Sequence, residues 1–166
     1  MLILGIDPGA TGGLAWIQVG ENSPLVKTMP MPTVKAKGHT YNDRKILYGL
    51  ITSADFVVLE KQQSMGKTTM MTTFTLGRGY GELLMACTLA GVRFAIARPQ
   101  DWQKGLLSGV PTSGKGKGKI VKQLAMEFVK MRWPETDFKA TPKCTTMHDG
   151  MVDAACIAEY GRRALL

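Results

Sequence analysis

Four acidic residues of this 166-residue chain stand where carboxylates could act together. Asp7 follows a mostly apolar run, Glu60 follows Val-Val-Leu, and the spacing of Asp149 and Asp153 places both on one face of a helix. Carboxylate oxygens, in a sequence with few histidines, favour Mg²⁺ or Mn²⁺ over zinc. Two such ions roughly 4 Å apart activate a water molecule and stabilise the leaving oxygen in phosphodiester hydrolysis. If the four side chains converge, they indicate metal-dependent hydrolysis.

Structural roles could also explain some of these acids. An Asp-Pro-Gly sequence often only caps a turn, and the dipole at the start of a helix favours Asp149. Asp153 lies one turn deeper among apolar residues, where a buried acid needs a metal or a partner. Four close carboxylates would raise one another's pKa values, and divalent cations would offset that repulsion. His148 either orients the water, the metal or the phosphate, or it only begins the helix.

The predicted elements would deliver these acids to one place. Residues 2–6 and 56–59 are short apolar runs typical of buried strands, and each run leads directly to a carboxylate. In an open sheet, chemistry gathers beyond the ends of the strands. The other expected elements are a hairpin strand at 14–17, strands at 25–29 and 92–97, helices around 46–51 and at 70–90, 120–131 and 149–164, and a helical turn around 102.

The segments between these elements carry expectations of their own. A loop is expected from Pro30 to His39, and a mobile, solvated one from Ser108 to Lys119. Glycines at 77, 79 and 81 lie inside the expected helix 70–90, at a cost of roughly 1 kcal/mol each relative to Ala. Close packing against another helix or backbone is the usual compensation, so we expect it there.

Composition limits the classes of protein that fit. The length predicts a single domain over residues 1–166 with a real core. No apolar run is long enough for a membrane span, and the N-terminus lacks the charged region of a signal peptide, so a non-secreted protein of a cytosol-like compartment is expected. Three cysteines without a paired motif read as reduced thiols. The net charge of +8 favours a polyanionic partner, although a charge that only keeps the protein soluble is the alternative.

Three blocks of sequence resemble the RuvC-type Holliday-junction resolvases of the RNase H-like superfamily. Gly5-Ile6-Asp7-Pro8-Gly9 with Gly12-Gly13 is similar to the first-strand motif of that family. Val57-Val58-Leu59-Glu60 resembles its second acidic strand, and Leu76-Gly77-Arg78-Gly79-Tyr80-Gly81 the glycine-rich helix that follows. His148-Asp149-Gly150-Met151-Val152-Asp153-Ala154-Ala155 resembles its C-terminal acidic helix. The order and spacing of the blocks cover nearly the whole chain.

The last block departs from the pattern of cellular bacterial members. Those proteins usually space their last two metal-site residues by three, and here Gly150 occupies the first of these places. Asp149 stands one residue earlier, a four-residue spacing more like that of phage-encoded and organellar members. Both spacings place the two residues on the same helix face, so the expected geometry of the site is the same. Of the two, Asp149 is less clearly assigned as a metal ligand.

The resemblance implies an α/β, RNase H-like fold with a five-stranded mixed sheet whose first three strands are antiparallel, flanked by helices. It implies a homodimeric crossover junction endodeoxyribonuclease that nicks two strands of a four-way DNA junction symmetrically. Asp7, Glu60, Asp149 and Asp153 would then be catalytic residues and ligands of two Mg²⁺ ions, which Mn²⁺ could replace. His148 would lend catalytic support.

The resemblance gives the basic residues a role in binding DNA. Repeated Gly-Lys in a chain of charge +8 makes Lys115, Lys117 and Lys119 expected phosphate contacts, with a merely solvated loop as the alternative. Arg98, Lys104 and Lys122 are secondary expected contacts. The segment Ser64–Phe74 stands where relatives place side chains that probe the junction, although Met65, Met70, Met71 and Phe74 also suit a core or a dimer interface.

The sequence also offers alternatives to a junction resolvase. Gly66-Lys67-Thr68 and Gly109–Lys115 imitate phosphate-binding loops, but the first lacks its leading glycine and the second its Ser/Thr and its strand, so no nucleotide cofactor is expected. The actin-like and sugar-kinase superfamily shares the Gly-Ile-Asp start but needs two lobes. A nuclease for other branched DNA is a further alternative. So is a non-catalytic junction-binding module, in which idle carboxylates facing DNA would weaken binding.

Overall fold

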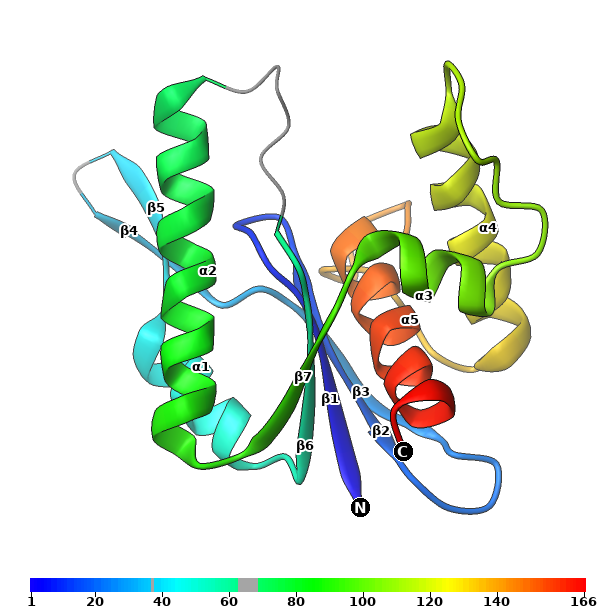
Figure 1. Cartoon of the computed structure of the whole chain (residues 1–166), viewed down its shortest axis with the longest axis horizontal. Coiled ribbons are helices and arrows are strands. Elements are labelled where there is room, and N and C mark those ends of the chain that lie inside the picture. Colours follow the sequence, from blue (N-terminus) through cyan, green and yellow to red (C-terminus); the bar gives the residue numbers. More distant parts are fainter. Residues whose placement is uncertain (37, 63–68) are drawn as a thin grey trace.

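A five-stranded mixed sheet forms the centre of the molecule, whose computed structural model describes residues 1–36, 38–62 and 69–166 (Figure 1). In spatial order its strands are β3 (Leu25–Pro30), β2 (Gly13–Gln18), β1 (Leu2–Asp7), β6 (Phe56–Glu60) and β7 (Arg93–Ala97). The first three pair antiparallel, and β1–β6 and β6–β7 pair parallel. This confirms the predicted sheet, including its antiparallel first three strands.

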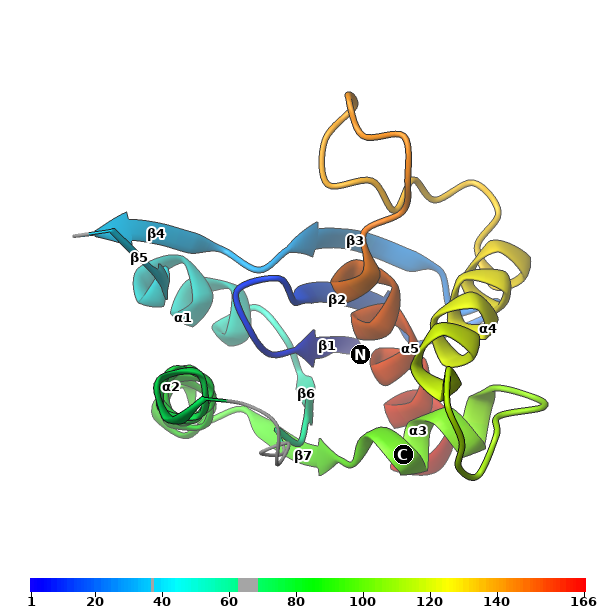
Figure 2. The ribbon, with the colours of Figure 1, turned by 90° about the horizontal axis from the view of Figure 1, so that it is seen from above.

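Helices cover both faces of the sheet (Figure 2). On one face lie α1 (Arg44–Thr52) and α2 (Met70–Ala90), and on the other lie α3 (Pro99–Leu106), α4 (Lys117–Arg132) and α5 (Asp149–Ala164). Successive strand residues alternate between the two cores because side chains alternate along a strand. In β1, Ile3 packs in the core under α5, whereas Leu4 and Ile6 pack in the core under α1 and α2.

Glycines let α5 lie directly on β1 and β2. A Cβ atom added at Gly5 would collide with the backbone of α5, and one at Gly13 would collide with the backbone of Gly150. Gly12 and Gly150 form an isolated parallel bridge. Glycine at position 150 therefore has a packing reason, since any side chain there would collide with the backbone of the turn between β1 and β2. This close approach brings the first turns of α5 beside the end of β1, where Asp7 stands.

The structure corrects three expectations about the connections. The loop expected over residues 30–39 is largely a second hairpin, β4 (Thr33–Ala36) paired with β5 (His39–Asn42). All of β4 is exposed, so the sequence there lacks the alternation of buried residues that signals a strand. The loop expected to run to Lys119 ends earlier. Helix α4 begins at Lys117 and not at residue 120, directly after Gly116, which has a left-handed φ of 87°. Of the three glycines inside α2, Gly79 lies close to the side-chain amide of Asn42, and Gly77 and Gly81 have no close neighbour among the described residues.

Two expectations from composition can be compared with the structure. Cys87, Cys144 and Cys156 are free thiols, as predicted. Among the described residues, no helix is long and apolar enough to cross a membrane.

Candidate active site

The four predicted carboxylates gather at one edge of the sheet. Asp7 ends β1 and Glu60 ends the parallel neighbour β6, while Asp149 and Asp153 come from the first two turns of α5. Burial raises the pKa of Asp7 well above its usual range, and the charges of Glu60, Asp153 and Asp149 raise it further. The acids are therefore close enough to act on one another, as the sequence predicts.

Asp153 is the most informative member of this cluster. Burial, followed by the nearby Glu60 and Asp149, raises the pKa of Asp153 to about 7. In the absence of a cation, this carboxyl is therefore only partly ionised at neutral pH. A deeply placed acid with three acidic neighbours has unbalanced negative charge, which is the condition that a bound cation relieves.

Glu60 has a partner that the sequence did not indicate. The indole N–H of Trp102, in α3, donates a hydrogen bond of 2.7 Å to Oε1 of Glu60, and the Trp102 side chain is buried. Burial raises the pKa of Glu60, and this hydrogen bond opposes the rise because it stabilises the ionised form. Trp102 therefore fixes one oxygen of Glu60. The sequence showed it only as an aromatic residue in a short helical turn.

Lys122 lies inside the acidic site. Its ammonium contacts Oδ2 of Asp149 at 2.5 Å, and the hydrogen bond and charge of Asp149 raise the pKa of Lys122. Its charge in turn lowers the pKa values of Asp7 and Asp153. Lys122 thus balances part of the negative charge from α4, a position that sequence reasoning assigned to DNA contact alone.

A cavity of about 500 Å³ opens at this cluster. Its lining includes Asp7, Asp149, Asp153, Lys122 and His148, and Glu60 lies outside it. His148 is the N-cap of α5, where its Nδ1 accepts a hydrogen bond of 3.3 Å from the backbone N–H of Met151. His148 therefore begins the helix, and its Nδ1 is engaged in that role.

The donor set fits a hard divalent cation in chemical type and charge. All four acids are oxygen donors, and burial, together with the charges of neighbouring carboxylates, raises the pKa values of Asp7 and Asp153. As placed, however, no three His, Cys, Asp or Glu side chains among the described residues form a group that could hold a metal ion. Two of the acids are instead held by Trp102 and Lys122.

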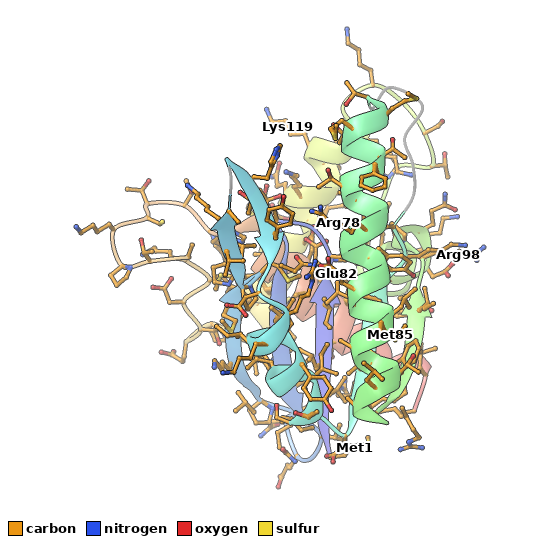
Figure 3. All side chains as sticks on the ribbon, turned by 90° about the vertical axis from the view of Figure 1, so that its left-hand side faces the viewer. Met1, Arg78, Glu82, Met85, Arg98 and Lys119 are labelled. Carbon is orange, nitrogen blue, oxygen red and sulfur yellow. The ribbon has the colours of Figure 1, made fainter. Side chains whose placement is uncertain are left out.

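The basic residues predicted to contact DNA fall into separate places. Lys115 lies just before α4, and Lys117 and Lys119 lie in its first turn, where Lys117 donates a hydrogen bond of 3.3 Å to the carbonyl of Thr112. Arg98 is bound to Asp101 by two hydrogen bonds of 2.8 Å each, so a carboxylate offsets its charge. In the view of Figure 3, Lys119 and Arg98 project on opposite sides of α2.

Arg98 and the other secondary basic residue, Lys104, do not belong to the acidic cavity. Lys104 is an exposed residue in the last turn of α3, and neither side chain lines the cavity. Lys122 is therefore the only one of the three secondary residues that borders it.

The segment expected to probe the junction is described only in part. Residues 64–68, including Met65, lie outside the described residues. Met70, Met71 and Phe74 begin α2 and are 90%, 70% and 68% exposed. The alternative that placed these three side chains in a core is therefore wrong.

Comparison with known proteins bears on the fold. No protein-family model and no curated protein sequence matches the chain. Among solved structures, RuvC of T. thermophilus in complex with a Holliday junction substrate matches with a TM-score of 0.62 and 17% identity, covering 99% of this chain and 97% of that one. A second structure of Thermus thermophilus RuvC matches with a TM-score of 0.52 and 20% identity, covering 98% and 96%.

The likeness establishes the fold. It spans nearly the full length of both chains, so the β-sheet and its flanking helices form the RNase H-like fold of RuvC. The resemblance read from the three sequence blocks is confirmed at this level.

Proposed function

We propose that this chain is a structure-selective endodeoxyribonuclease that resolves four-way DNA junctions by paired symmetric nicks. The observation that supports it is the convergence of four carboxylates at the carboxyl edge of β1 and β6, in the fold of RuvC. The T. thermophilus protein with that fold was solved with a Holliday junction substrate. A single domain over residues 1–166 would carry the activity.

In this proposal Asp7, Glu60, Asp149 and Asp153 bind two Mg²⁺ ions, which Mn²⁺ could replace. Bound divalent cations supply the activation of water and the stabilisation of the leaving oxygen. Trp102 orients Glu60, and Lys122 balances the charge of Asp149 until the carboxylate is needed as a ligand. Catalytic support from His148 remains a prediction.

The proposed DNA contacts are electrostatic. Lys115, Lys117 and Lys119 would bind phosphates, and Lys122 stands where a phosphate entering the acidic cavity would meet a cation. The ion pair with Asp101 makes Arg98 a weaker contact than the sequence suggested. The net charge of +8 supports a polyanionic substrate.

We also propose a homodimer, because paired symmetric nicks need two sites. The support is an exposed apolar face on the C-terminal half of α2 and on α1. Met85 is 58% exposed, Leu89 67% and Tyr48 43%, and they border a hollow of about 470 Å³. This face would be the interface with the second copy.

The experiment that tests the function compares a synthetic four-way junction with a plain duplex, each with Mg²⁺ and with EDTA. The proposal predicts paired nicks at symmetric positions in the junction alone, which EDTA abolishes. Equal cutting of both substrates would indicate a general nuclease, and preference for another branched form would change the substrate. Tight binding without cutting would indicate the non-catalytic module.

A further inference from the structure

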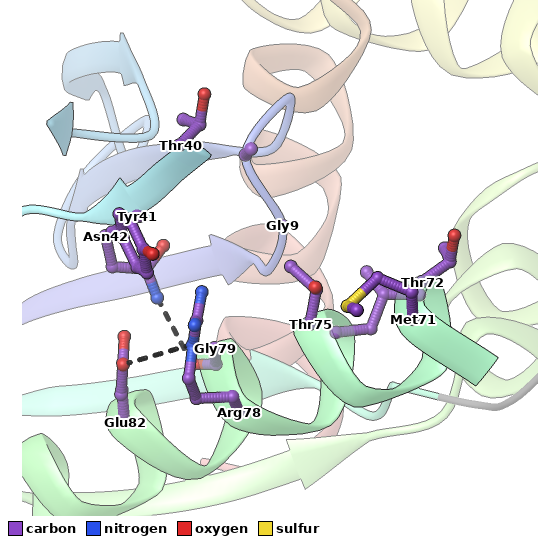
Figure 4. A pocket seen from close by; sticks show the side chains of 12 residues that line it. Gly9, Thr40, Tyr41, Asn42, Met71, Thr72, Thr75, Arg78, Gly79 and Glu82 are labelled. Carbon is purple, nitrogen blue, oxygen red and sulfur yellow. Dashed lines mark hydrogen bonds and ion pairs between the residues drawn. The ribbon is translucent and has the colours of Figure 1, made fainter. Parts of the chain in front are cut away.

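A second hollow lies beside the acidic site, between β5 and α2 (Figure 4). It has a volume of about 240 Å³ and adjoins another of about 370 Å³. Six residues line both, and we call the joint hollow the Arg78 groove: Ala10, Thr40, Tyr41, Met71, Thr75 and Arg78.

Arg78 is the unusual group in this groove. Its Nε is buried and has no hydrogen-bond acceptor among the described residues. The nearest carboxylate oxygen, Oε1 of Glu82, is 3.8 Å away and already accepts a hydrogen bond of 2.7 Å from Arg44. Buried donors on charged groups are rarely left without an acceptor, so each one calls for an explanation. A ligand with anionic oxygens would supply the missing acceptor.

The charge around the groove favours an anion. Glu82 also lines the hollow of about 240 Å³, but its Oε1 lies 2.7 Å from Arg44, outside the groove, and 3.8 Å from Arg78, so the charge of Arg78 is incompletely balanced. A guanidinium offers a planar fork of donors that matches two oxygens of a phosphate. Figure 4 shows the Arg78 side chain between Tyr41 on β5 and Thr75 on α2. Thr40 and Thr75 also line the groove.

Tyr41 lines both hollows, and one face of its ring is not free to stack on a base. The guanidinium carbon of Arg78 lies 4.4 Å from the centroid of the Tyr41 ring, so it covers that face. Stacking on that face would require Arg78 to leave. The arrangement therefore suits a phosphate, with Tyr41 holding the guanidinium in place.

The groove also lies next to the acidic site along the chain. Gly9 and Ala10 line it, and Gly9 is two residues from Asp7, a span of at most about 7 Å. A DNA strand with one phosphate at Asp7 would pass over this turn toward Arg78.

We infer that the Arg78 groove binds a phosphodiester of the DNA strand held in the acidic site, at a phosphate other than the one that is cut. Arg78 is the charged donor of this subsite, and Tyr41 positions it. The inference rests on the proposed function, because it assigns the ligand to the same strand.

The test measures the salt dependence of binding to a four-way junction in EDTA, where no cutting occurs. Arg78→Gln should lower the slope of log affinity against log salt by about 0.9, the value for one lost phosphate contact. The matched control is Arg93→Gln, which removes the same charge at the exposed start of β7, the end of the sheet opposite Glu60. The control should keep the wild-type slope, and equal slopes for the two variants would overturn the inference.

A second measurement does not depend on the variant folding. In ¹⁵N-arginine-labelled wild-type protein, the Nε–H signal of Arg78 should shift on addition of the junction. No shift would overturn the inference. So would the same shift with inorganic phosphate at an equal concentration of phosphate groups, because that result would indicate a general anion site.

The failure of this inference can be told from the failure of the proposed function. A wild-type protein that binds and cuts the junction, with an unchanged slope in Arg78→Gln, would refute only the Arg78 subsite. A wild-type protein that does not bind the junction at all would refute both.

Discussion

The indole N–H of Trp102 donates a 2.7 Å hydrogen bond to Oε1 of Glu60, joining α3 to the end of β6. The two residues are 42 positions apart in sequence. This bond keeps one oxygen of a buried acid oriented and favours its ionised form. The site therefore depends on a residue outside the acidic cluster.

Replacing Trp102 with Phe would remove this bond and keep most of the ring. We expect about a 10- to 100-fold loss of junction cleavage, the range found when an outer partner of a metal ligand is removed. The pKa of Glu60 would rise further, so the pH at which activity appears should move upward. The measurement is the pH profile of cleavage for both proteins. An unchanged profile with a lower rate would mean that Trp102 acts only through packing.

The raised pKa of Asp153 predicts how the stability of the metal-free protein depends on pH. A carboxyl that binds its proton more tightly in the folded state stabilises the fold below its unfolded pKa, and this contribution is lost as the pH rises through the folded value. For Asp153 the loss runs from about pH 4 to about pH 7. Asp153→Asn should therefore raise the unfolding free energy at pH 8 by on the order of a few kcal/mol and have little effect near pH 4.

The measurement is thermal unfolding in EDTA at both pH values. Glu135→Gln, at an exposed position, is the control and should change little at either pH. A destabilised Asp153→Asn protein at pH 8 would contradict the account of the site as unbalanced negative charge.

Lys122 and a divalent cation should compete for Asp149. Lys122→Met removes a positive charge beside the site and the hydrogen bond to Oδ2 of Asp149. We expect Mg²⁺ to bind this variant several-fold more tightly in the absence of DNA, as measured by calorimetry, because repulsion between cations is removed. Lys130→Met, in the last turn of α4, is the control. Weaker Mg²⁺ binding by Lys122→Met alone would show that the lysine helps to assemble the metal site.

The apolar face of α2 predicts the oligomeric state. Leu89→Glu places a charge in the proposed interface and should convert a dimer into a monomer at micromolar concentration, as measured by light scattering. Met131→Glu changes an even more exposed apolar residue, in α4, and should leave the dimer intact. A wild-type protein that is a monomer, both free and with junction DNA, would contradict the dimer.

The sequence predicted the parts of the fold that depend on local apolar patterns. The buried runs ending in Asp7 and Glu60 and the spacing of Asp149 and Asp153 were sufficient to place four acids together. Contacts between distant segments left no such pattern. From the sequence Trp102 is only an aromatic residue in a short helical turn, and its hydrogen bond to Glu60 depends on how α3 lies relative to β6. All of β4 is exposed, so no alternation of buried residues marked that strand of the second hairpin.

Arg78 and Lys122 show the same limit for charged residues. Each lies on a helix with a regular pattern, and only the packing of that helix reveals its partners. In the sequence Arg78 is only part of a glycine-rich motif, whereas in the structure its guanidinium lies over the ring of Tyr41 in β5. The sequence indicates a DNA contact for Lys122, whereas in the structure α4 places it against Asp149.

We propose that the carboxylate cluster cuts DNA. The most direct test is single-turnover cleavage of a four-way junction in Mg²⁺ by wild-type protein and by Asp7→Asn, with junction binding measured in parallel. The account predicts that Asp7→Asn binds the junction but cleaves it at least about a hundredfold more slowly. Cleavage by Asp7→Asn at the wild-type rate would contradict the account.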